Sequence, residues 1–196
     1  SEITHISLVP TQLSQVLEVR SGRPPPETFQ CALVGGAQTP KNLLDRAISA
    51  GWPIALTYGL TELTSQVATA PPDLTRRKPG TVGAPLSSVE VRLDERGEIQ
   101  VRGDTLASGY VGDYSESLTD SEGWHRTGDL GSFDSDGHLW ITGRRTDRIV
   151  TGGVTVDAVE VEEALRSHPA VADVCVVGIP DEEWGERVGV WVEPTD

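Results

Sequence analysis

The first third of the chain contains three short apolar runs that are typical of buried parallel strands. They cover residues 4–9, 29–34 and 53–58, and each is followed at once by Pro or Gly. The segments between them are long enough for crossover helices, which are right-handed and set consecutive strands parallel. We therefore predict an α/β part with a parallel sheet over residues 1–79.

Two segments between these strands have apolar residues at helical spacing. Pro10 suits the first turn of one helix. In the next segment Thr39 is a candidate N-cap, Pro40 fits the first helical position, and Gly51 would end the helix. The predicted inner faces consist of Leu13, Val16 and Leu17 in the first helix, and of Leu43, Leu44, Ala47 and Ile48 in the second.

After residue 80 the apolar pattern changes to period two. Apolar and polar residues alternate over 88–93, the sequence DERG turns the chain, and alternation resumes over 98–103. A second hairpin has Asp136-Gly137 as its turn; the alternative of a calcium loop fails because a third oxygen ligand is missing. This pattern predicts a β-rich subdomain over residues 80–143.

The last part, residues 144–196, mixes helix and strand. Asp157 followed by Glu160 is a capping-box pattern ahead of a helical apolar stripe, and 171–180 and 187–194 read as strands. We predict a hinge and a partial small α+β domain here. The fold class is therefore α/β plus a β-rich subdomain plus a small α+β domain.

The distribution of charged residues favours a domain boundary, and the net charge opposes binding to anionic partners. The formal net charge of −14 opposes binding to nucleic acid or to an anionic membrane. Residues 1–79 carry 7 Lys and Arg against 6 Asp and Glu, whereas residues 80–196 carry 9 against 24, which favours a boundary near 76–83. No stretch is apolar enough to span a bilayer, so we expect no membrane insertion and a cytoplasmic location.

Two glycine-containing loops follow predicted strands, GGA at 35–37 and YGLTE at 58–62. Carboxyl ends of parallel strands share one edge of the sheet, and ligands bind there in open α/β folds. In the second loop the Thr61 hydroxyl could hold a phosphate and the Glu62 carboxylate a Mg²⁺ ion. The alternatives are an exposed loop acid for Glu62 and a packing role for the Tyr58 ring.

Asp129 and Arg144 lie in turns on either side of the second predicted hairpin. The carboxylate could accept hydrogen bonds from ribose hydroxyls, and the guanidinium could donate to the same sugar or to a phosphate. The alternative is a structural ion pair that ties the hairpin together. Further along, the pair Gly152-Gly153 permits a close approach of a narrow ligand, and Trp184 is either a packing residue or a stacking platform.

The order and spacing of these motifs resemble the adenylate-forming superfamily, which comprises acyl-CoA synthetases, peptide-synthetase adenylation domains and luciferases. The resemblance is carried by YGLTE, GEIQVRG, WHRTGDLGSFDSDGHLWITGRRTD and TGGVTVDAVEVEEAL, and it covers essentially the whole chain. Within the family, THISLVPTQL, VGGA and YGLTELTSQVAT are most similar to o-succinylbenzoate–CoA ligases of menaquinone or phylloquinone biosynthesis. The resemblance implies the C-terminal portion of the adenylate-forming enzyme fold.

The resemblance also implies a reaction and its site. Such enzymes join a carboxylic acid to ATP with Mg²⁺, release pyrophosphate, and then exchange AMP for CoA. Thr61 would contact phosphate, Glu62 would carry the metal, and His5 matches a gating position near the acyl carboxylate. The residues expected at the nucleotide are Gly35, Gly36, Ala37, Tyr58, Gly59, Asp129 and Arg144.

By the same resemblance, Thr146 is the hinge and Gly153 approaches the CoA tunnel when the small domain rotates. Many relatives have Asp or Lys at the hinge position, and GGVTVDA replaces their common GGENVxP. The family's Ser/Thr/Gly-rich phosphate loop should lie before residue 1, and its C-terminal lysine beyond residue 196. Neither Lys41 nor Lys78 matches that lysine, so we expect the isolated fragment to be inactive and the full-length enzyme to be active.

Two other functions remain open. The same fold could load an amino or aryl acid onto a carrier-protein thiol, or act as another aryl- or acyl-CoA ligase. A different class is a non-catalytic nucleotide-binding module. The expected partners are a small carboxylic acid, ATP and CoA, and a homo-oligomer is possible.

Overall fold

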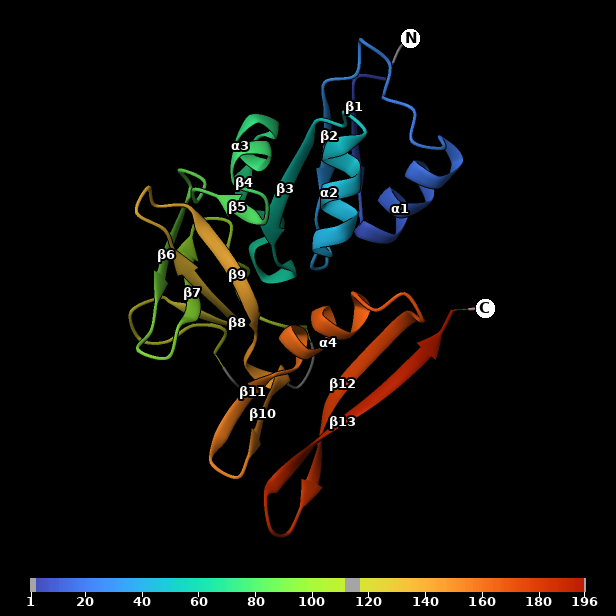
Figure 1. The fold of residues 1–196 in the computed structure, drawn as a ribbon. Coiled ribbons are helices and arrows are strands. Elements are labelled where there is room, and N and C mark those ends of the chain that lie inside the picture. Colours follow the sequence, from blue (N-terminus) through green and yellow to red (C-terminus); the bar gives the residue numbers. More distant parts are fainter. Residues whose placement is uncertain (1–2, 112–116, 196) are drawn as a thin grey trace. The chain divides into compact units, whose positions relative to one another are not determined.

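The computed structural model describes residues 3–111 and 117–195, apart from the side chain of Thr146. The chain forms two compact units (Figure 1). The first unit comprises Ser1–Thr127 and Gly131–Ile141, and the second comprises Gly128–Leu130 and Thr142–Asp196. The dividing points fall inside two strands, so each unit is described separately below.

The first unit begins with a four-stranded sheet that contains the predicted parallel strands. Its order is β1-β2-β3-β4, with β1, β2 and β3 parallel and β4 antiparallel to β3. The fourth strand was not expected from the sequence. The bounds are β1 His5–Leu8, α1 Pro10–Val19, β2 Cys31–Val34, α2 Lys41–Ser49, β3 Ile54–Gly59 and β4 Gln66–Ala70.

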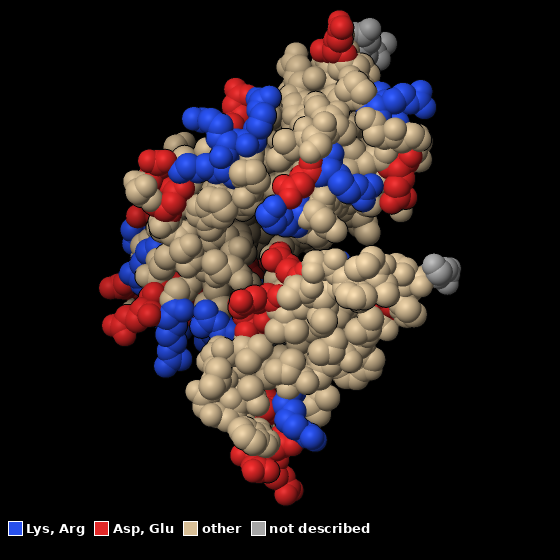
Figure 2. Space-filling model, viewed as in Figure 1, with Lys and Arg blue, Asp and Glu red and all other residues tan. Residues whose placement is uncertain are grey.

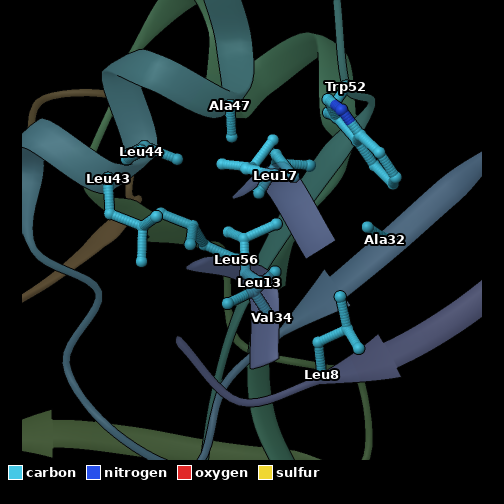
Figure 3. Close-up of a cluster of buried hydrophobic side chains, with 11 residues drawn as sticks. Leu8, Leu13, Leu17, Ala32, Val34, Leu43, Leu44, Ala47, Trp52 and Leu56 are labelled. Atoms are coloured by element: carbon cyan, nitrogen blue, oxygen red, sulfur yellow. The ribbon is translucent and has the colours of Figure 1, made fainter. Parts of the chain in front are cut away.

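Helices α1 and α2 cover this sheet with the predicted apolar residues. Figure 3 shows side chains of both helices and of the strands meeting in one cluster, in which Leu13 and Ala47 are fully buried. Ile48 packs at the margin of the cluster. The prediction of a Thr39 cap is wrong, because Pro40 occupies the N-cap position and the N-cap makes no side-chain hydrogen bond. Proline restricts the entering backbone instead.

The β-rich part of the chain forms a five-stranded sheet in the order β5-β9-β8-β7-β6. The predicted hairpin of β6 and β7 is antiparallel, with Val91 opposite Val101. The loop between β8 and β9 is longer than the two-residue turn that we predicted. The bounds are η1 Thr61–Leu63, α3 Pro72–Arg77, β5 Thr81–Gly83, β6 Val89–Leu93, β7 Glu98–Gly103, β8 His125–Phe133 and β9 Leu139–Arg144.

The second unit contains a sheet in the order β11-β10-β13-β12 and one helix. Asp157 caps that helix as predicted, with its Oδ1 atom accepting from the Val159 N–H at 3.0 Å. The hairpin of β10 and β11 was not expected from the sequence. The bounds are η2 Arg145–Asp147, β10 Arg148–Thr151, β11 Val154–Asp157, α4 Ala158–Arg166, β12 Val171–Asp181 and β13 Gly185–Pro194.

The structure bears out the fold class of α/β, β-rich and small α+β parts. Among the residues that it describes, no helix is long and apolar enough to cross a membrane. Both cysteines, Cys31 and Cys175, are free thiols.

Lys78 links the end of α3 to the loop between β8 and β9. Its ammonium lies 2.6 Å from Oδ2 of Asp134 and 2.6 Å from Oδ2 of Asp136. Asp134 also accepts backbone hydrogen bonds from Asp136 and His138, which explains the length of this loop. The Lys78 ammonium, followed by these N–H donors, holds the pKa of the Asp134 carboxyl far below its usual range.

We predict that Lys78→Met lowers the melting temperature at neutral pH and that the deficit shrinks in acid. A carboxyl with a depressed pKa contributes stability above its unfolded-state pKa, about 3.9, and loses it as the pH falls toward the folded value. Thermal unfolding between pH 7 and pH 3 measures this. Lys41→Met is the control, because Lys41 makes only an exposed helical pair with Asp45. A deficit that stays constant with pH would contradict the prediction.

Candidate nucleotide and acyl-transfer site

The carboxyl ends of β1, β2 and β3 meet at one edge of the first sheet, as the sequence predicted. Gly35 follows β2, and its N–H donates to the carbonyl of Leu8 at the end of β1, at 3.2 Å. A Cβ on Gly35 would lie 2.5 Å from Cγ2 of Thr57, so only glycine fits this approach to β3. Gly36 and Ala37 are exposed beyond it. The backbone of residues 35–37 is therefore accessible at the carboxyl-terminal edge of the sheet.

Gly59 ends β3 at the same edge, and its backbone also approaches a neighbour closely. A Cβ there would lie 2.2 Å from the carbonyl oxygen of Ser65, at the start of the return into β4. The preceding Tyr58 is only 9% exposed and packs with Leu63 and Val67. The ring therefore has the packing role that the sequence allowed, and a small part of it stays accessible to a ligand.

Thr61 and Glu62 lie in the short helix η1 that follows β3. The Glu62 carboxylate accepts a hydrogen bond from the Tyr110 hydroxyl at 2.6 Å, and the Glu62 carbonyl accepts from the N–H of Ala107 at 2.7 Å. The hydrogen bond to Glu62 is the main cause that raises the pKa of Tyr110. No periodic pattern marks Tyr110 in the sequence, because it lies in an irregular loop 48 residues after Glu62.

The Glu62 turn fits a magnesium ion held mainly by a substrate. Mg²⁺ takes one or two carboxylates and completes its shell with water and phosphate oxygens. Thr61 is exposed and Glu62 is half-buried, and the Tyr110 hydroxyl donates to Oε1 of Glu62. A second group of possible ligand atoms, on Asp134, Asp136 and His138, surrounds the Lys78 ammonium, which already supplies the positive charge.

Asp129 and Arg144 form an ion pair within the second unit. Nε of Arg144 lies 2.8 Å from Oδ1 of Asp129, which joins β8 to the end of β9. The Asp129 side chain is 9% exposed, whereas that of Arg144 is 69% exposed. The structural pair that the sequence allowed is therefore present. It is compatible with ligand binding, because a guanidinium has five N–H donors and a carboxylate accepts several bonds.

The predicted hinge and glycine pair also lie in the second unit. Thr146 lies in η2, and its side chain is outside the part that the structure describes. Gly152 and Gly153 form the turn between β10 and β11, both with positive φ. Gly153 is exposed, and no atom lies within 4 Å of the place of a Cβ.

His5 is not brought together with the strand-end loops. It is the first residue of β1, and β1 runs parallel to β2, so His5 lies at the opposite edge of the sheet from Gly35. Its ring is exposed and Nδ1 is 3.0 Å from the hydroxyl of Thr4. The geometry gives no support to the gating role predicted for it.

Comparisons with known proteins connect these features to one family. Residues 1–111 match the AMP-binding enzyme family, and residues 160–196 match the AMP-binding enzyme C-terminal domain. The chain is 37% identical over 200 residues to a 2-succinylbenzoate–CoA ligase of Bacillus cereus strain Q1, a match that covers 97% of the chain and 42% of the relative. The chain thus spans less than half the length of this relative.

Solved structures of related enzymes match the fold of this chain over nearly its whole length. The Bacillus subtilis o-succinylbenzoate CoA synthetase (MenE) in complex with the acyl-adenylate intermediate OSB-AMP has a TM-score of 0.88 and 36% identity, covering 99% of this chain and 42% of that one. The same enzyme with ATP and magnesium ion has a TM-score of 0.84 and 36% identity over 97% of this chain and 41% of that one.

These structural matches confirm the predicted portion of the adenylate-forming fold. The family match extends over more than half of the chain, as residues 1–111. The relative from Bacillus cereus adds sequence identity along nearly all of the rest. The chain belongs to the AMP-binding enzyme family.

Proposed function

We propose that this chain works within an enzyme that activates a carboxylic acid with ATP and then transfers the acyl group to CoA. The acid carboxylate would attack the α-phosphate of ATP, forming an acyl-adenylate and releasing pyrophosphate. The CoA thiol would then displace AMP to give the thioester. The observation that carries the proposal is the 37% identity to a 2-succinylbenzoate–CoA ligase over 97% of the chain, which makes o-succinylbenzoate the proposed acid.

The proposed work of the first unit is to position the nucleotide. Gly35, Gly36, Ala37 and Gly59 would let the base and the acyl group lie against backbone, with the accessible part of the Tyr58 ring beside the base. The Thr61 hydroxyl would donate to a phosphate oxygen. Glu62 would hold Mg²⁺, and the metal would offset the negative charge that develops when two anions react.

The proposed work of Asp129 and Arg144 is to grip the ribose. The Asp129 carboxylate would accept from both sugar hydroxyls while it keeps its bond to Arg144. The guanidinium, 69% exposed, would donate to the same sugar. We further propose that residues 144–196 rotate about Thr146 as a small domain, which presents Gly153 during thioester formation. A homo-oligomer and a cytoplasmic location stay predictions.

Neither lysine of the chain offers a cation to the reacting acid. Lys41 pairs with Asp45, and Lys78 pairs with Asp134 and Asp136. The chain also covers only 42% of the relative's length. We therefore propose the activity for a complete enzyme that contains this chain.

The first prediction here is that the product of the complete open reading frame converts o-succinylbenzoate, ATP and CoA into the CoA thioester, AMP and pyrophosphate. Mass spectrometry of the thioester and a coupled pyrophosphate assay measure both products. Benzoate and a fatty acid serve as competing acids, and a phosphopantetheinyl carrier protein as a competing thiol. Preference for the carrier protein would establish a carrier-loading enzyme instead, and nucleotide binding without turnover with any acid would indicate a binding module.

The second prediction is that Glu62→Gln lowers the rate of adenylate formation by about 10²- to 10³-fold, as for loss of one group that stabilises developing charge. The neutral amide keeps an acceptor for Tyr110 but binds Mg²⁺ weakly. Acid-dependent pyrophosphate exchange measures the effect as a function of magnesium concentration. Glu27→Gln, at an exposed site, is the matched control and should match the wild type. Equal activity of both variants would contradict the metal role.

The third prediction separates the structural from the ribose-binding role of Arg144. Arg144→Ala takes a hydrogen-bond donor from the nearly buried Asp129 carboxylate, so the free energy of unfolding should fall by about 1–3 kcal/mol. The KM for ATP should rise about tenfold, since one charge-assisted hydrogen bond contributes roughly 1.5 kcal/mol. Urea unfolding and initial rates measure the two effects. Arg96→Ala, in the exposed DERG turn, is the control. A loss of stability with an unchanged KM for ATP would show that the pair of Arg144 with Asp129 is structural only, and would contradict the ribose-binding role.

A further inference from the structure

The turn between β10 and β11 consists of two glycines, Gly152 and Gly153. Its backbone conformation does not require glycine at both positions. Thr151 and Val154 face each other across β10 and β11, which leaves a two-residue hairpin loop. The φ angles are +56° at Gly152 and +82° at Gly153. Positive φ at both positions is the signature of a type I′ turn, whose first position favours Asn and Asp as well as Gly. Backbone conformation alone therefore does not explain Gly152.

The indole of Trp184 explains it. A Cβ on Gly152 would lie 2.6 Å from Cε3 and 2.8 Å from Cζ3 of that ring, so any side chain would displace the indole. Gly153 differs, because no atom comes within 4 Å of the place of its Cβ. One glycine thus accommodates a protein side chain, and the other leaves open space on the surface.

Trp184 is fixed to this turn from its own side. The loop between β12 and β13 folds around Asp181, whose Oδ1 atom accepts from the N–H groups of Glu183 and Trp184 at 3.0 and 2.9 Å. Arg187 holds the other carboxylate oxygen at 2.6 Å. The Trp184 carbonyl then accepts from the Gly152 N–H at 2.9 Å. These bonds fix the backbone of Trp184 beside the turn, although the residue is 50% exposed.

A second contact joins the same two segments. Oε2 of Glu186 accepts from the N–H of Val150 at 2.7 Å. In Figure 2 the visible face of the β12–β13 hairpin carries few charged side chains, and its charges gather at the end of the hairpin that bears Trp184. Polar groups at this end of the hairpin therefore bond to the β10–β11 segment, and the Trp184 indole packs on the Gly152-Gly153 turn.

We infer that Trp184 is a positioning residue for the thioester-forming step, because it holds the Gly152-Gly153 turn in the conformation that presents Gly153 to the pantetheine arm of CoA. The inference rests on the proposed function. Pantetheine is a narrow chain with amide groups, so it fits an exposed backbone turn that lacks a Cβ. A loose turn would present Gly153 in many orientations, and misplacement by about 1 Å costs up to 10²-fold in rate.

The first experiment tests the contact without any catalysis, by hydrogen exchange of the backbone amides in residues 148–157. Trp184→Ala and Gly152→Asn should each accelerate exchange, whereas Gly153→Asn should not, because Asn tolerates positive φ and the site is open. The double variant with Trp184→Ala and Gly152→Asn should exchange no faster than either single variant, since both remove one contact. Additive effects would overturn the assigned contact.

The second experiment measures the two half-reactions in the complete enzyme. Trp184→Ala should raise the KM for CoA roughly 10-fold or more, and leave acid-dependent pyrophosphate exchange at the wild-type rate. Trp184→Phe, which keeps a ring on Gly152, should recover most of the loss. Trp191→Ala is the control, because Trp191 is also exposed, at 60%, and lies on β13 rather than at the turn.

The outcomes separate this inference from the proposed function. Faster amide exchange with an unchanged KM for CoA would overturn the positioning role and leave the ligase function in place. A wild-type enzyme that forms no thioester would overturn the ligase function and the positioning role together. Equal effects of Trp184→Ala on both half-reactions would show a general structural role and would also overturn the inference.

Discussion

The close approach of backbone at the carboxyl ends of β2 and β3 is the constraint on which the first half of the site depends. Gly35 lies against Thr57, and Gly59 lies against Ser65, at distances that exclude a Cβ. This approach sets the chain into η1 directly beyond the sheet, where Glu62 meets Tyr110. A larger residue at either glycine would separate the strand ends, and the acid would lose its fixed position relative to the edge of the sheet.

The sequence predicted the features that depend on local pattern. The parallel strands β1 to β3, their helices and the hairpin of β6 and β7 follow from apolar periodicity, which each segment carries by itself. The sequence did not predict the elements whose structure depends on tertiary contacts. β10 and β11 are short and include the exposed valines Val150 and Val154. Apolar and polar residues therefore do not alternate clearly along these strands, and the sequence does not predict their pairing. The β8–β9 loop is lengthened by the Asp134 side chain, which caps two backbone donors.

The same distinction applies to the candidate site. Asp129, Arg144 and Glu62 could be named from motifs, and the structure shows Asp129 and Arg144 in contact. Tyr110 and Trp184 act on partners remote in sequence, so only coordinates reveal what they touch. His5 was also named from a motif. It lies at the first residue of β1, away from the strand-end loops, and its gating role stays a prediction.

The charge distribution limits how an anionic nucleotide could be recognised. A net charge of −14 repels ATP at long range, so attraction has to come from short contacts. Both lysines are already paired with carboxylates. The Arg144 side chain, which we propose for ribose binding, is 69% exposed. A magnesium ion that arrives with the nucleotide would supply the remaining positive charge, and Glu62 would bind it. This requirement would give a strongly acidic chain a use for an acid, rather than a base, beside the Thr61 hydroxyl that we propose for phosphate binding.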